Sequence, residues 1–462
     1  MVSFFMSKVG KAAIPTVSVY VISRNYGRFL EQAIESVLQQ HYDDWELILI
    51  DDNSTDQTSE IMQLYAGDGR VRILKTQGIG LPAAANRALQ ESRGKYLIRL
   101  DGDDVFDENI LFILASYLDR CPEAALVFPD YYLIDELGEV FAHERRQKIA
   151  EFSHLTDMPP NGACTLIRKS VLESIGGYRE DLGAQDGFDL WSKIRNTHRA
   201  LNVNLPLFYY RRHNQNLTNS SHRILAARRQ IKKDAIVAQV EKYCPILAVI
   251  PCRKNYDFRQ DLWATELNGK SLLSRKLEMC LTSTLFDKVI VASDTSEVLD
   301  IMKDFNDHRL EFFKRDSSET LRSRNIVGTL GRLAEKFDPE ANGVTVLCYL
   351  PSPFVLLESL EEAVHTLVFN DADSSVGVEE IKEPIYCRTP FGLKMINAVG
   401  AYRTDHDYVY REANIAMATK NKNFSRGSLT GPSPINFIVS RDESFFIDSE
   451  KKLQIAHILD TK

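Results

Sequence analysis

The ten-residue stretch KYLIRLDGDD, residues 95–104, constrains the fold more than any other part of the chain. Its first half is apolar except for Arg99, which predicts a strand buried within a sheet. Its second half places three carboxylates around a glycine, at Asp101, Asp103 and Asp104. Because charged groups are costly in a sheet interior, we expect the strand to end there and to present its acids at the carboxyl edge, where open α/β sheets bind ligands.

Carboxylates this close together repel one another unless a positive group joins them. A hard divalent cation with oxygen ligands meets that need, and does so better when it also carries the phosphates of a substrate. The stretch therefore predicts a metal site at the strand end. Taken alone, it leaves open the alternative of a plain acidic turn after a strand.

Strand and helix patterns alternate through the first half of the chain. Strands are expected at residues 17–22, 45–50 and 71–74, and helices at 29–40, 56–65 and 82–91. Further on, a helix is expected at 107–120 and strands at 124–129 and 161–167. This alternation predicts a mostly parallel sheet with right-handed crossovers. Asp51 and Asp52 follow the second strand, so a second acid cluster is expected at the edge where a nucleotide would lie.

The composition excludes several classes of protein. The chain has 462 residues and a net charge of −8, which gives no attraction to nucleic acid or to anionic membranes. No apolar run is long enough to span a bilayer, and residues 1–15 lack the apolar core and cleavage site of a signal peptide. The seven cysteines are scattered and never form CxxC, which argues against a zinc site and indicates a reducing compartment. We therefore expect a cytoplasmic protein without a nucleic-acid partner.

Residues 15–220 resemble the family-2 glycosyltransferases of the GT-A fold. The resemblance rests on VSVYVISRNYGRFLEQAIESVLQQ, WELILIDDNSTDQT and ANRALQESRGKYLIRLDGDD, and then on CTLIRKSVLESIGGYRED, QDGFDLWSKI and YYRRHNQNLT. It implies that Ser23 and Asp52 lie against the base and ribose of a nucleotide-sugar donor. It also implies that Asp101 and Asp103 form the DXD pair, with Mg²⁺ or Mn²⁺ and the diphosphate at Asp103, and that Asp104 braces the same turn.

The same resemblance gives Asp186 the role of general base. The family has Glu-Asp where this chain has Gln185-Asp186, a change that leaves the base in place but alters its surroundings. The alternative is that Asp186 caps the helix that follows it. His213 stands where some relatives place a residue that contacts metal or phosphate, and the alternative there is a structural or merely exposed histidine.

These residue types suit the chemistry that the resemblance implies. A sugar hydroxyl is a poor nucleophile near neutral pH, so a carboxylate must take its proton during the attack. A divalent metal stabilises the charge that develops on the departing nucleoside diphosphate. One base without an enzyme nucleophile implies a single displacement with inversion. The expected function is transfer of a sugar to the hydroxyl of a glycan or lipid-linked acceptor, in the synthesis of a surface glycan or polysaccharide.

Two Rossmann-like nucleotide-binding domains are expected, at residues 1–219 and 245–462, joined by a helical linker at 220–244. The second domain is indicated by strands expected at 246–250, 288–292, 344–350 and 374–378. The linker carries a basic run, which is expected to lie on a solvated helix face, at Arg228, Arg229, Lys232 and Lys233. The alternative is that this run binds acidic lipid, which would give peripheral membrane association.

Residues 246–460 resemble the acylneuraminate cytidylyltransferases, which make CMP-activated nonulosonic acids. The resemblance rests on LAVIPCR, LNGKSLL, FDKVIVASDTSEV, VLCYLPSPFVLLESLEEAV, DADSSVGVEE and FFIDSEKKLQIAHIL. In that family a loop rich in glycine and lysine holds the triphosphate, whereas here the loop reads KNYDFRQDLWATELN. Asp257 and Leu262 replace its two lysines, Val355 replaces an arginine, and Phe446 replaces the first metal-binding acid, which leaves Asp448.

These departures predict a cytidylyltransferase fold that has lost catalysis. Such a domain could instead form a homodimer, bind a partner or sense a nucleotide. Two alternatives remain at this point. One is a bifunctional enzyme that also activates a nonulosonic acid as its CMP-sugar, and the other is a non-catalytic protein that binds nucleotide-sugars or acts as a scaffold.

Overall fold

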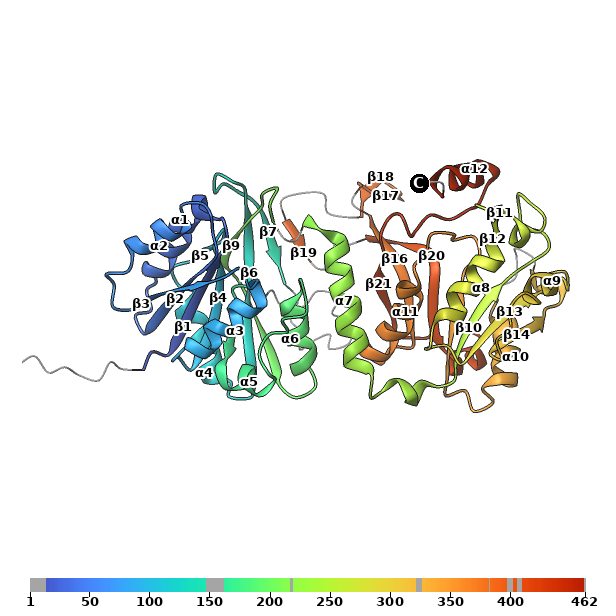
Figure 1. The fold of residues 1–462 in the computed structure, drawn as a ribbon, viewed down its shortest axis with the longest axis horizontal. Coiled ribbons are helices and arrows are strands. Elements are labelled where there is room, and N and C mark those ends of the chain that lie inside the picture. The colour runs from blue at the N-terminus through green and yellow to red at the C-terminus, as the bar shows by residue number, and fades with distance from the viewer. Residues whose placement is uncertain are drawn as a thin grey trace, which may run out of the picture. The chain divides into compact units, whose positions relative to one another are not determined.

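The computed structural model describes residues 14–146, 162–216, 219–320, 326–381, 383–396, 402–404 and 409–460. The chain divides into two compact units, the first made of residues 1–220 and 397–407 and the second of residues 221–396 and 408–462. Both units are α/β (Figure 1), so the expected fold class is confirmed. Among the described residues, no helix is long and apolar enough to cross a membrane.

The first unit is built on one ten-stranded sheet. Its strands are β1 (Val17–Ser23), β2 (Trp45–Asp52), β3 (Val71–Thr76), β4 (Tyr96–Asp101), β5 (Val105–Phe106), β6 (Ala124–Ile134), β7 (Val140–Arg145), β8 (Leu166–Arg168), β9 (Arg199–Arg211) and β19 (Tyr402–Thr404). The main path of the sheet runs β19-β7-β6-β8-β4-β1-β2-β3, and β9 pairs with β5 and β6. Strands β4, β1, β2 and β3 are parallel neighbours, as the β/α alternation predicts.

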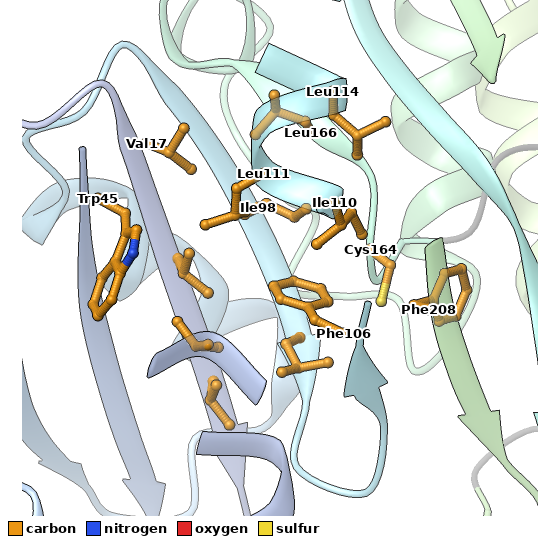
Figure 2. Packing of buried hydrophobic residues seen from close by; sticks show 14 of the residues in the cluster. Val17, Trp45, Ile98, Phe106, Ile110, Leu111, Leu114, Cys164, Leu166 and Phe208 are labelled. Atoms are coloured by element: carbon orange, nitrogen blue, oxygen red, sulfur yellow. The ribbon is translucent and has the colours of Figure 1, made fainter. Parts of the chain in front are cut away.

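Helices follow most of these strands, and the strand side chains alternate between two cores. The helices are α1 (Gly27–Leu38), α2 (Thr58–Leu64), α3 (Leu81–Glu91), α4 (Ile110–Arg120), α5 (Lys169–Ser174) and α6 (Asp186–Ile194). Ile98 of β4 points to one core, which α1 and α4 line and which Figure 2 shows in part. Leu97 points to the other core, which α3 and α6 line. The central strands are therefore buried on both faces, as their continuous apolar runs indicate.

One expected strand is much shorter than predicted. The pattern predicts a strand at residues 161–167, but β8 begins only at Leu166, and residue 161 lies outside the described residues. The chain turns just before β8, where Cys164 has a positive φ of 58° and its N–H donates to the carbonyl oxygen of Arg99. A left-handed backbone cannot continue a pleated strand, and the apolar pattern alone does not reveal it.

The second unit contains a seven-stranded sheet in the order β14-β13-β10-β15-β20-β16-β21. These strands are β10 (Ile246–Pro251), β13 (Lys288–Ser293), β14 (Leu310–Lys314), β15 (Val344–Cys348), β16 (Ser374–Ile381), β20 (Val409–Lys420) and β21 (Pro434–Ile438). Two small ribbons are formed by β11 (Glu266–Leu267) with β12 (Lys270–Ser271), and by β17 (Tyr386–Thr389) with β18 (Gly392–Met395). The α-helices are α7 (Ser221–Ile236), α8 (Leu272–Thr282), α9 (Val298–Met302), α10 (Val327–Phe337), α11 (Leu357–Asn370) and α12 (Glu450–Leu459).

The basic helix α7 packs against α11 of the second unit. Arg229 Nε lies 2.7 Å from Glu362 Oε2, and Lys232 Nζ lies 2.7 Å from Glu362 Oε1. The Lys232 side chain is 3% exposed. The expectation that this basic run faces solvent is therefore wrong for Arg229 and Lys232, because a buried acid from a distant helix pairs with both.

Candidate active site at the carboxyl edge of the first sheet

The ends of three parallel strands bring the expected donor residues to one edge of the first sheet. Ile22 of β1 is in register with Asp101 of β4, and Ser23 is in register with Asp51 of β2. Ser23, Asp52 and Asp101 are thus each the last residue of a strand. Two acid clusters at one edge follow directly from parallel pairing of strands that end in the same kind of residue.

Asp52 organises the glycine turn that leads into α3. Its carboxylate accepts hydrogen bonds from Thr76 Oγ1 at 2.6 Å, from the Ile79 N–H at 2.8 Å and from the Gly80 N–H at 2.9 Å. Burial raises the pKa of Asp52, but these hydrogen bonds outweigh it and keep the pKa below its usual value. Gly78 and Gly80 have positive φ angles, which glycine adopts without strain. An ionised Asp52 therefore fixes the shape of this turn.

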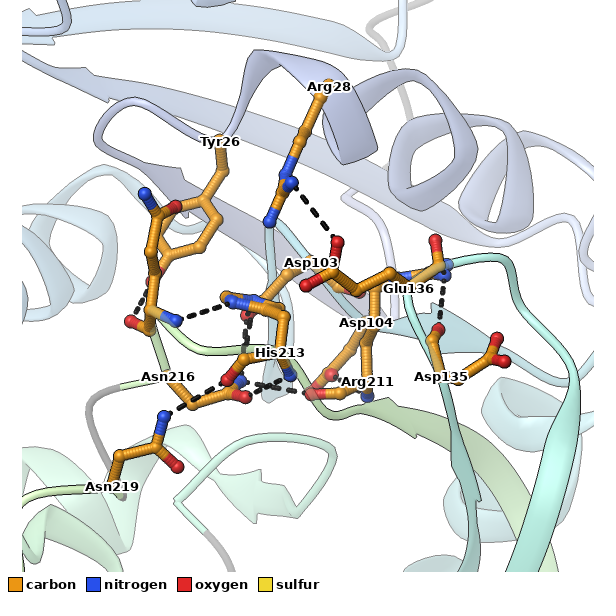
Figure 3. Close-up of polar contacts among 11 residues, drawn as sticks. Tyr26, Arg28, Asp103, Asp104, Asp135, Glu136, Arg211, His213, Asn216 and Asn219 are labelled. Carbon is orange, nitrogen blue, oxygen red and sulfur yellow. Dashed lines mark hydrogen bonds and ion pairs between the residues drawn. The ribbon is translucent and has the colours of Figure 1, made fainter.

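Asp103 and His213, the two residues expected at the metal, lie in contact. Asp103 Oδ2 is 2.9 Å from His213 Nε2, and the Asn216 side-chain amide donates to the same oxygen at 3.4 Å (Figure 3). The Gln215 N–H donates to His213 Nδ1 at 3.1 Å. Since that nitrogen accepts, the proton of a neutral ring is on Nε2 and is donated to Asp103. The Tyr26 and Phe29 rings approach His213, with 5.7 and 5.3 Å between ring centroids, and the imidazole is buried.

Asp104 faces the protein interior and is bonded to the end of β9. Its Oδ1 accepts the Arg211 backbone N–H at 2.9 Å, while Arg211 Nε donates to the Asp103 carbonyl oxygen at 2.8 Å. Burial raises the pKa of Asp104 well above its usual value, and the neighbouring Asp103 and Asp101 raise it further. The buried guanidinium of Arg211 thus joins the acid turn to the end of β9. Sequence reasoning missed this residue, and no local pattern marks it.

Arg99 contacts both Asp101, which is expected to bind the nucleotide-sugar, and Asp186, the expected general base. Its Nε lies 2.9 Å from Asp101 Oδ1, and its Nη1 forms an ion pair with Asp186 Oδ2. Burial raises the pKa of Asp101 to about 6, with Arg99 opposing and Asp103 and Asp186 reinforcing that rise. Sequence reasoning also missed Arg99, although a lone cation in a buried strand, two positions before an acid on the same face, was a usable signal.

Asp186 does not act as a helix cap. The residue before α6 is Gln185, in a left-handed conformation, and no side chain caps the helix N-terminus. Asp186 is the first residue of α6, and its carboxylate instead lies beside Arg99 and against the backbone of Gly162. The structure therefore places the Asp186 carboxylate at the same strand end as Asp101.

The donor set fits a divalent cation that takes most of its ligands from elsewhere. Among the described residues, no three His, Cys, Asp or Glu side chains gather closely enough to hold a metal. Asp103 would supply an oxygen ligand and His213 a nitrogen ligand once Nε2 carries no proton, and Mg²⁺ or Mn²⁺ would take its remaining ligands from a diphosphate and water. Two more polar atoms lie at this edge, Ser23 Oγ and Asp104 Oδ2. Among the described residues, both are buried side-chain atoms that have no hydrogen-bond partner.

The second unit holds a pocket of about 580 Å³ beyond the ends of β10 and β13. Its lining comprises Arg253, Lys254, Asn255, Tyr256, Asp257, Asp294, Thr295, Ser296, Lys314, Ser317 and Thr320. Lys254 Nζ lies 2.7 Å from Glu297, and Lys314 Nζ donates to the Asp294 carbonyl oxygen at 2.6 Å. Sequence reasoning did not identify Lys254 and Lys314 as residues of a binding pocket. In the structure the first is paired with a carboxylate and the second is hydrogen-bonded to a carbonyl oxygen.

The positions that depart from the cytidylyltransferase pattern lie in different surroundings. Leu262 is fully buried and Val355 is 2% exposed, so both serve the core. Asp257 lines the pocket, and one of its oxygens lies 3.9 Å from Arg253. Asp448 forms an ion pair with Lys452 at 2.6 Å. A triphosphate would therefore meet an acid and no cation at the substituted loop positions.

Two family models match separate parts of the chain. Residues 18–176 match the family model for glycosyl transferase family 2, and residues 265–428 match that for cytidylyltransferase. Over 122 residues the chain is 35% identical to the glycosyltransferase GlyG of Streptococcus pneumoniae, which covers 26% of this chain and 40% of that protein. Over 182 residues it is 26% identical to a chondroitin synthase of Escherichia coli, which covers 39% of this chain and 26% of that protein. The chain thus spans less than half the length of either relative.

Among solved structures, the chain is similar to the mannosyltransferase PcManGT from Pyrobaculum calidifontis, determined in complex with GDP-Man and Mn²⁺. The TM-score is 0.40 and the sequence identity 19%, over 49% of this chain and 65% of that one. The family models identify a glycosyl transferase family 2 domain at residues 18–176 of this chain, followed by a cytidylyltransferase domain at residues 265–428.

Proposed function

We propose that the first unit is an inverting, metal-dependent glycosyltransferase that moves a sugar from a nucleoside-diphosphate sugar to a hydroxyl acceptor. The observation that carries this proposal is the placing of Asp101, Asp103 and Asp186 at one strand end, with Arg99 between the first and the last. These residues come from two elements, β4 with its following turn and α6, which only the fold brings together. The chondroitin synthase relative suggests a glycan as the acceptor and a role in polysaccharide synthesis.

In the proposed mechanism, the strand ends bind the donor. Ser23 and Asp52 meet the base and ribose, Asp52 partly through the turn that it holds. Asp103 and His213 would hold the divalent cation, which would supply positive charge to the diphosphate of the donor. Nε2 of His213 and Oδ2 of Asp103, which now lie 2.9 Å apart, are the atoms that would face this cation. Asp104 keeps this turn in place by its bond to the Arg211 backbone.

Asp186 acts on the acceptor. Its carboxylate is 18% exposed, so an incoming hydroxyl can reach it, and it takes the hydroxyl proton as the oxygen attacks the anomeric carbon. No covalent sugar–enzyme bond forms, so the anomeric configuration inverts. The base needs a fixed position because misplacement of a reacting group by about 1 Å costs about 100-fold in rate.

The direct test is Asp186→Asn. We expect this variant to keep Mn²⁺-dependent binding of nucleoside diphosphates and to lose about 100-fold or more of its turnover, since a base acts in the reaction rather than on the bound nucleotide. The assay is release of nucleoside diphosphate from UDP-GlcNAc, UDP-Glc, UDP-Gal and GDP-Man, with oligosaccharides and water as acceptors. The matched control is Asp181→Asn, because Asp181 is a nearby exposed acid paired with Arg179. Turnover by Asp186→Asn equal to that of the control would refute the base assignment.

For the second unit we propose nucleotide binding without cytidylyl transfer. The pocket beyond β10 and β13 supports binding, because three cations line it, at Arg253, Lys254 and Lys314. The acid at Asp257 and the partial neutralisation of Lys254 disfavour a triphosphate. In the full-length protein with Mg²⁺, we expect calorimetric binding of CMP and no release of pyrophosphate from CTP with nonulosonic acids. Robust pyrophosphate release would instead establish the bifunctional enzyme.

We also propose that the second unit forms a homodimer. The hairpin of β17 and β18 exposes apolar side chains that a partner copy would cover, among them Tyr386, Phe391 and Leu393. Light scattering of wild type and of Phe391→Asp tests this. A dimer that dissociates in the variant supports the proposal, and a monomeric wild type refutes it.

A further inference from the structure

Arg99 occupies an unusual position for a charged residue. It lies in the middle of a central strand, between β1 and β8, and its side chain is 5% exposed. A buried charge is stable only when it is paired. Arg99 has two anionic partners, Asp101 on its own strand and Asp186 on α6, so one guanidinium spans both. Arginine suits this position because its planar fork presents donors in several directions, which an ammonium group does not.

The backbone fixes where the guanidinium lies. Side chains alternate along β4, so Leu97, Arg99 and Asp101 share the face that α6 covers. The Arg99 carbonyl oxygen accepts the N–H of Cys164 at 2.7 Å, which fixes the strand from the other side. The fold therefore determines the distance between Arg99 and the start of α6.

A pair of buried tyrosines packs around the same charge. Tyr20 is in register with Arg99 on the neighbouring strand β1, and its Oη donates to Tyr178 Oη at 2.9 Å. Tyr178 is held by Asn86, which bonds to both its backbone N–H and its carbonyl oxygen at 2.8 Å. The hydroxyls of Tyr20 and Tyr178 are uncharged, so Asp101 and Asp186 are the anionic partners of the guanidinium.

Gly162 limits the Asp186 carboxylate from the opposite side. A Cβ atom at this position would overlap both carboxylate oxygens of Asp186. The carboxylate is therefore confined between the guanidinium of Arg99 and the bare backbone of Gly162. Each of these two residues touches Asp186, and neither belongs to the expected donor or metal set.

We propose that Arg99 is a positioning residue that sets the Asp186 carboxylate at a fixed distance from the donor-side Asp101, with Gly162 as the opposing wall. This inference rests on the proposed transferase function. Arg99 contacts carboxylates and acts through them. Its removal should therefore lower turnover by way of Asp186 and leave Mn²⁺-dependent nucleotide binding at Asp103 largely in place.

The test is a double-mutant cycle in the full-length protein, with release of nucleoside diphosphate from the four nucleotide-sugars as the readout. We expect Arg99→Gln to lower kcat by about 100-fold, the cost of a misplaced reacting group, with a much smaller change in donor KM. In an Asp186→Asn background the same change should cost little more, because its target is gone. Arg99→Lys should restore only part of kcat, since one ammonium cannot span both acids.

Arg168→Gln is the control for loss of a partly buried arginine. Its guanidinium bonds to backbone carbonyl oxygens, including that of Ala124, so the variant should lower the melting temperature and leave kcat unchanged. If Arg99→Gln does not fold, Gly162→Ala replaces it, because it displaces the Asp186 carboxylate and removes no charge. Gly69→Ala, with open space around it, is the control for that substitution.

The outcomes separate the two proposals. A wild type that releases no nucleoside diphosphate overturns the proposed function and this inference with it. An active wild type in which the Arg99 and Asp186 effects multiply overturns this inference alone, as does full activity of Arg99→Lys. Full activity of Gly162→Ala shows that Gly162 does not confine Asp186. If Arg99→Gln also fails to fold, that result overturns the whole proposal. A non-additive cycle with partial rescue by lysine supports it.

Discussion

Each unit contains a cluster of paired charges, and the two clusters differ in their exposure to water and in their charge balance. In the first unit, Arg99 lies between two acids, Asp101 and Asp186. In the second, Glu362 lies between two cations, Arg229 and Lys232. The acids of the first cluster are 30% and 18% exposed, whereas the Glu362 and Lys232 side chains are 2% and 3% exposed. We call the Arg99 cluster the open cluster, because its acids reach water, and the Glu362 cluster the sealed cluster.

The clusters also differ in charge balance. Arg229 pairs with a further acid, Glu443, at 3.2 Å, so the sealed cluster contains two cations and two acids. The open cluster contains two acids to one cation, and Asp103 follows two residues later in the chain. Neutrality and burial suit a cluster that only holds helices together, whereas an exposed excess of one sign suits a cluster that meets a ligand. From this difference we expect the unbalanced cluster of the first unit, and not the balanced cluster of the second, to meet a ligand.

The largest effect is expected in the sealed cluster. Glu362→Gln leaves Lys232 and Arg229 with an uncompensated positive charge away from water, which costs about 3–5 kcal/mol of unfolding free energy. Urea unfolding of the full-length protein measures it. Mn²⁺-dependent nucleotide binding at the first unit should persist wherever the protein is folded. A cost under 1 kcal/mol, as for a surface pair, would remove the distinction between the clusters.

A smaller but functionally decisive effect is expected beside the open cluster. Asp103→Asn should weaken Mn²⁺-dependent binding of UDP or GDP by about 100-fold, because a neutral amide is a poor ligand for a hard cation. The melting temperature without nucleotide should change little, since the amide oxygen of asparagine can still accept the hydrogen bonds from His213 and Asn216. Asp119→Asn, which removes a half-exposed acid paired with Lys95, is the matched control. Unchanged affinity in Asp103→Asn would rule out the metal site.

A surface pair sets the lower end of the scale. Hydrogen bonding to Arg332 lowers the pKa of Glu319 to about 2. Because this pKa is below the unfolded value, the pair stabilises the protein above about pH 4.5, and that contribution is lost as the pH falls toward 2. Glu319→Gln should cost about 0.5–1 kcal/mol at pH 7 after allowance for solvent screening, and less at pH 3.5. Unfolding free energies at the two pH values would show whether the cost shrinks in that direction.

The sequence predicted the alternating part of the fold well, for a physical reason. A buried parallel strand must be apolar along its whole length, so β1, β2 and β4 appear as apolar runs, and the acids that end them are visible in the same way. The two acid clusters, and their common edge, follow from that pattern alone. By contrast, the turn before β8 depends on the left-handed Cys164, which no periodicity encodes.

The contacts across the site could not be predicted because they join residues far apart in the chain. Arg99 and Asp186 are separated by 87 positions, and Asp104 and Arg211 by 107. The pattern around Arg99 signalled a buried cation but gave no partner for it. The basic run in α7 misled for the same reason, since Lys232 finds Glu362 130 positions away. Charge patterns show that a partner is needed, and only the fold shows which residue it is.

The strand β19 has a consequence for truncation of this protein and for the exchange of its two units in evolution. Residues 402–404 pair in parallel with β7 of the first unit. The segments on either side of them, residues 221–396 and 408–462, belong to the second unit. The polypeptide therefore enters the first unit twice. A gene split after residue 220 would encode a first module that lacks one edge strand of its sheet and exposes the unpaired edge of β7. Exchange of one module for a homologue would consequently have to carry this short segment along, so the two halves are expected to evolve as a single inherited piece.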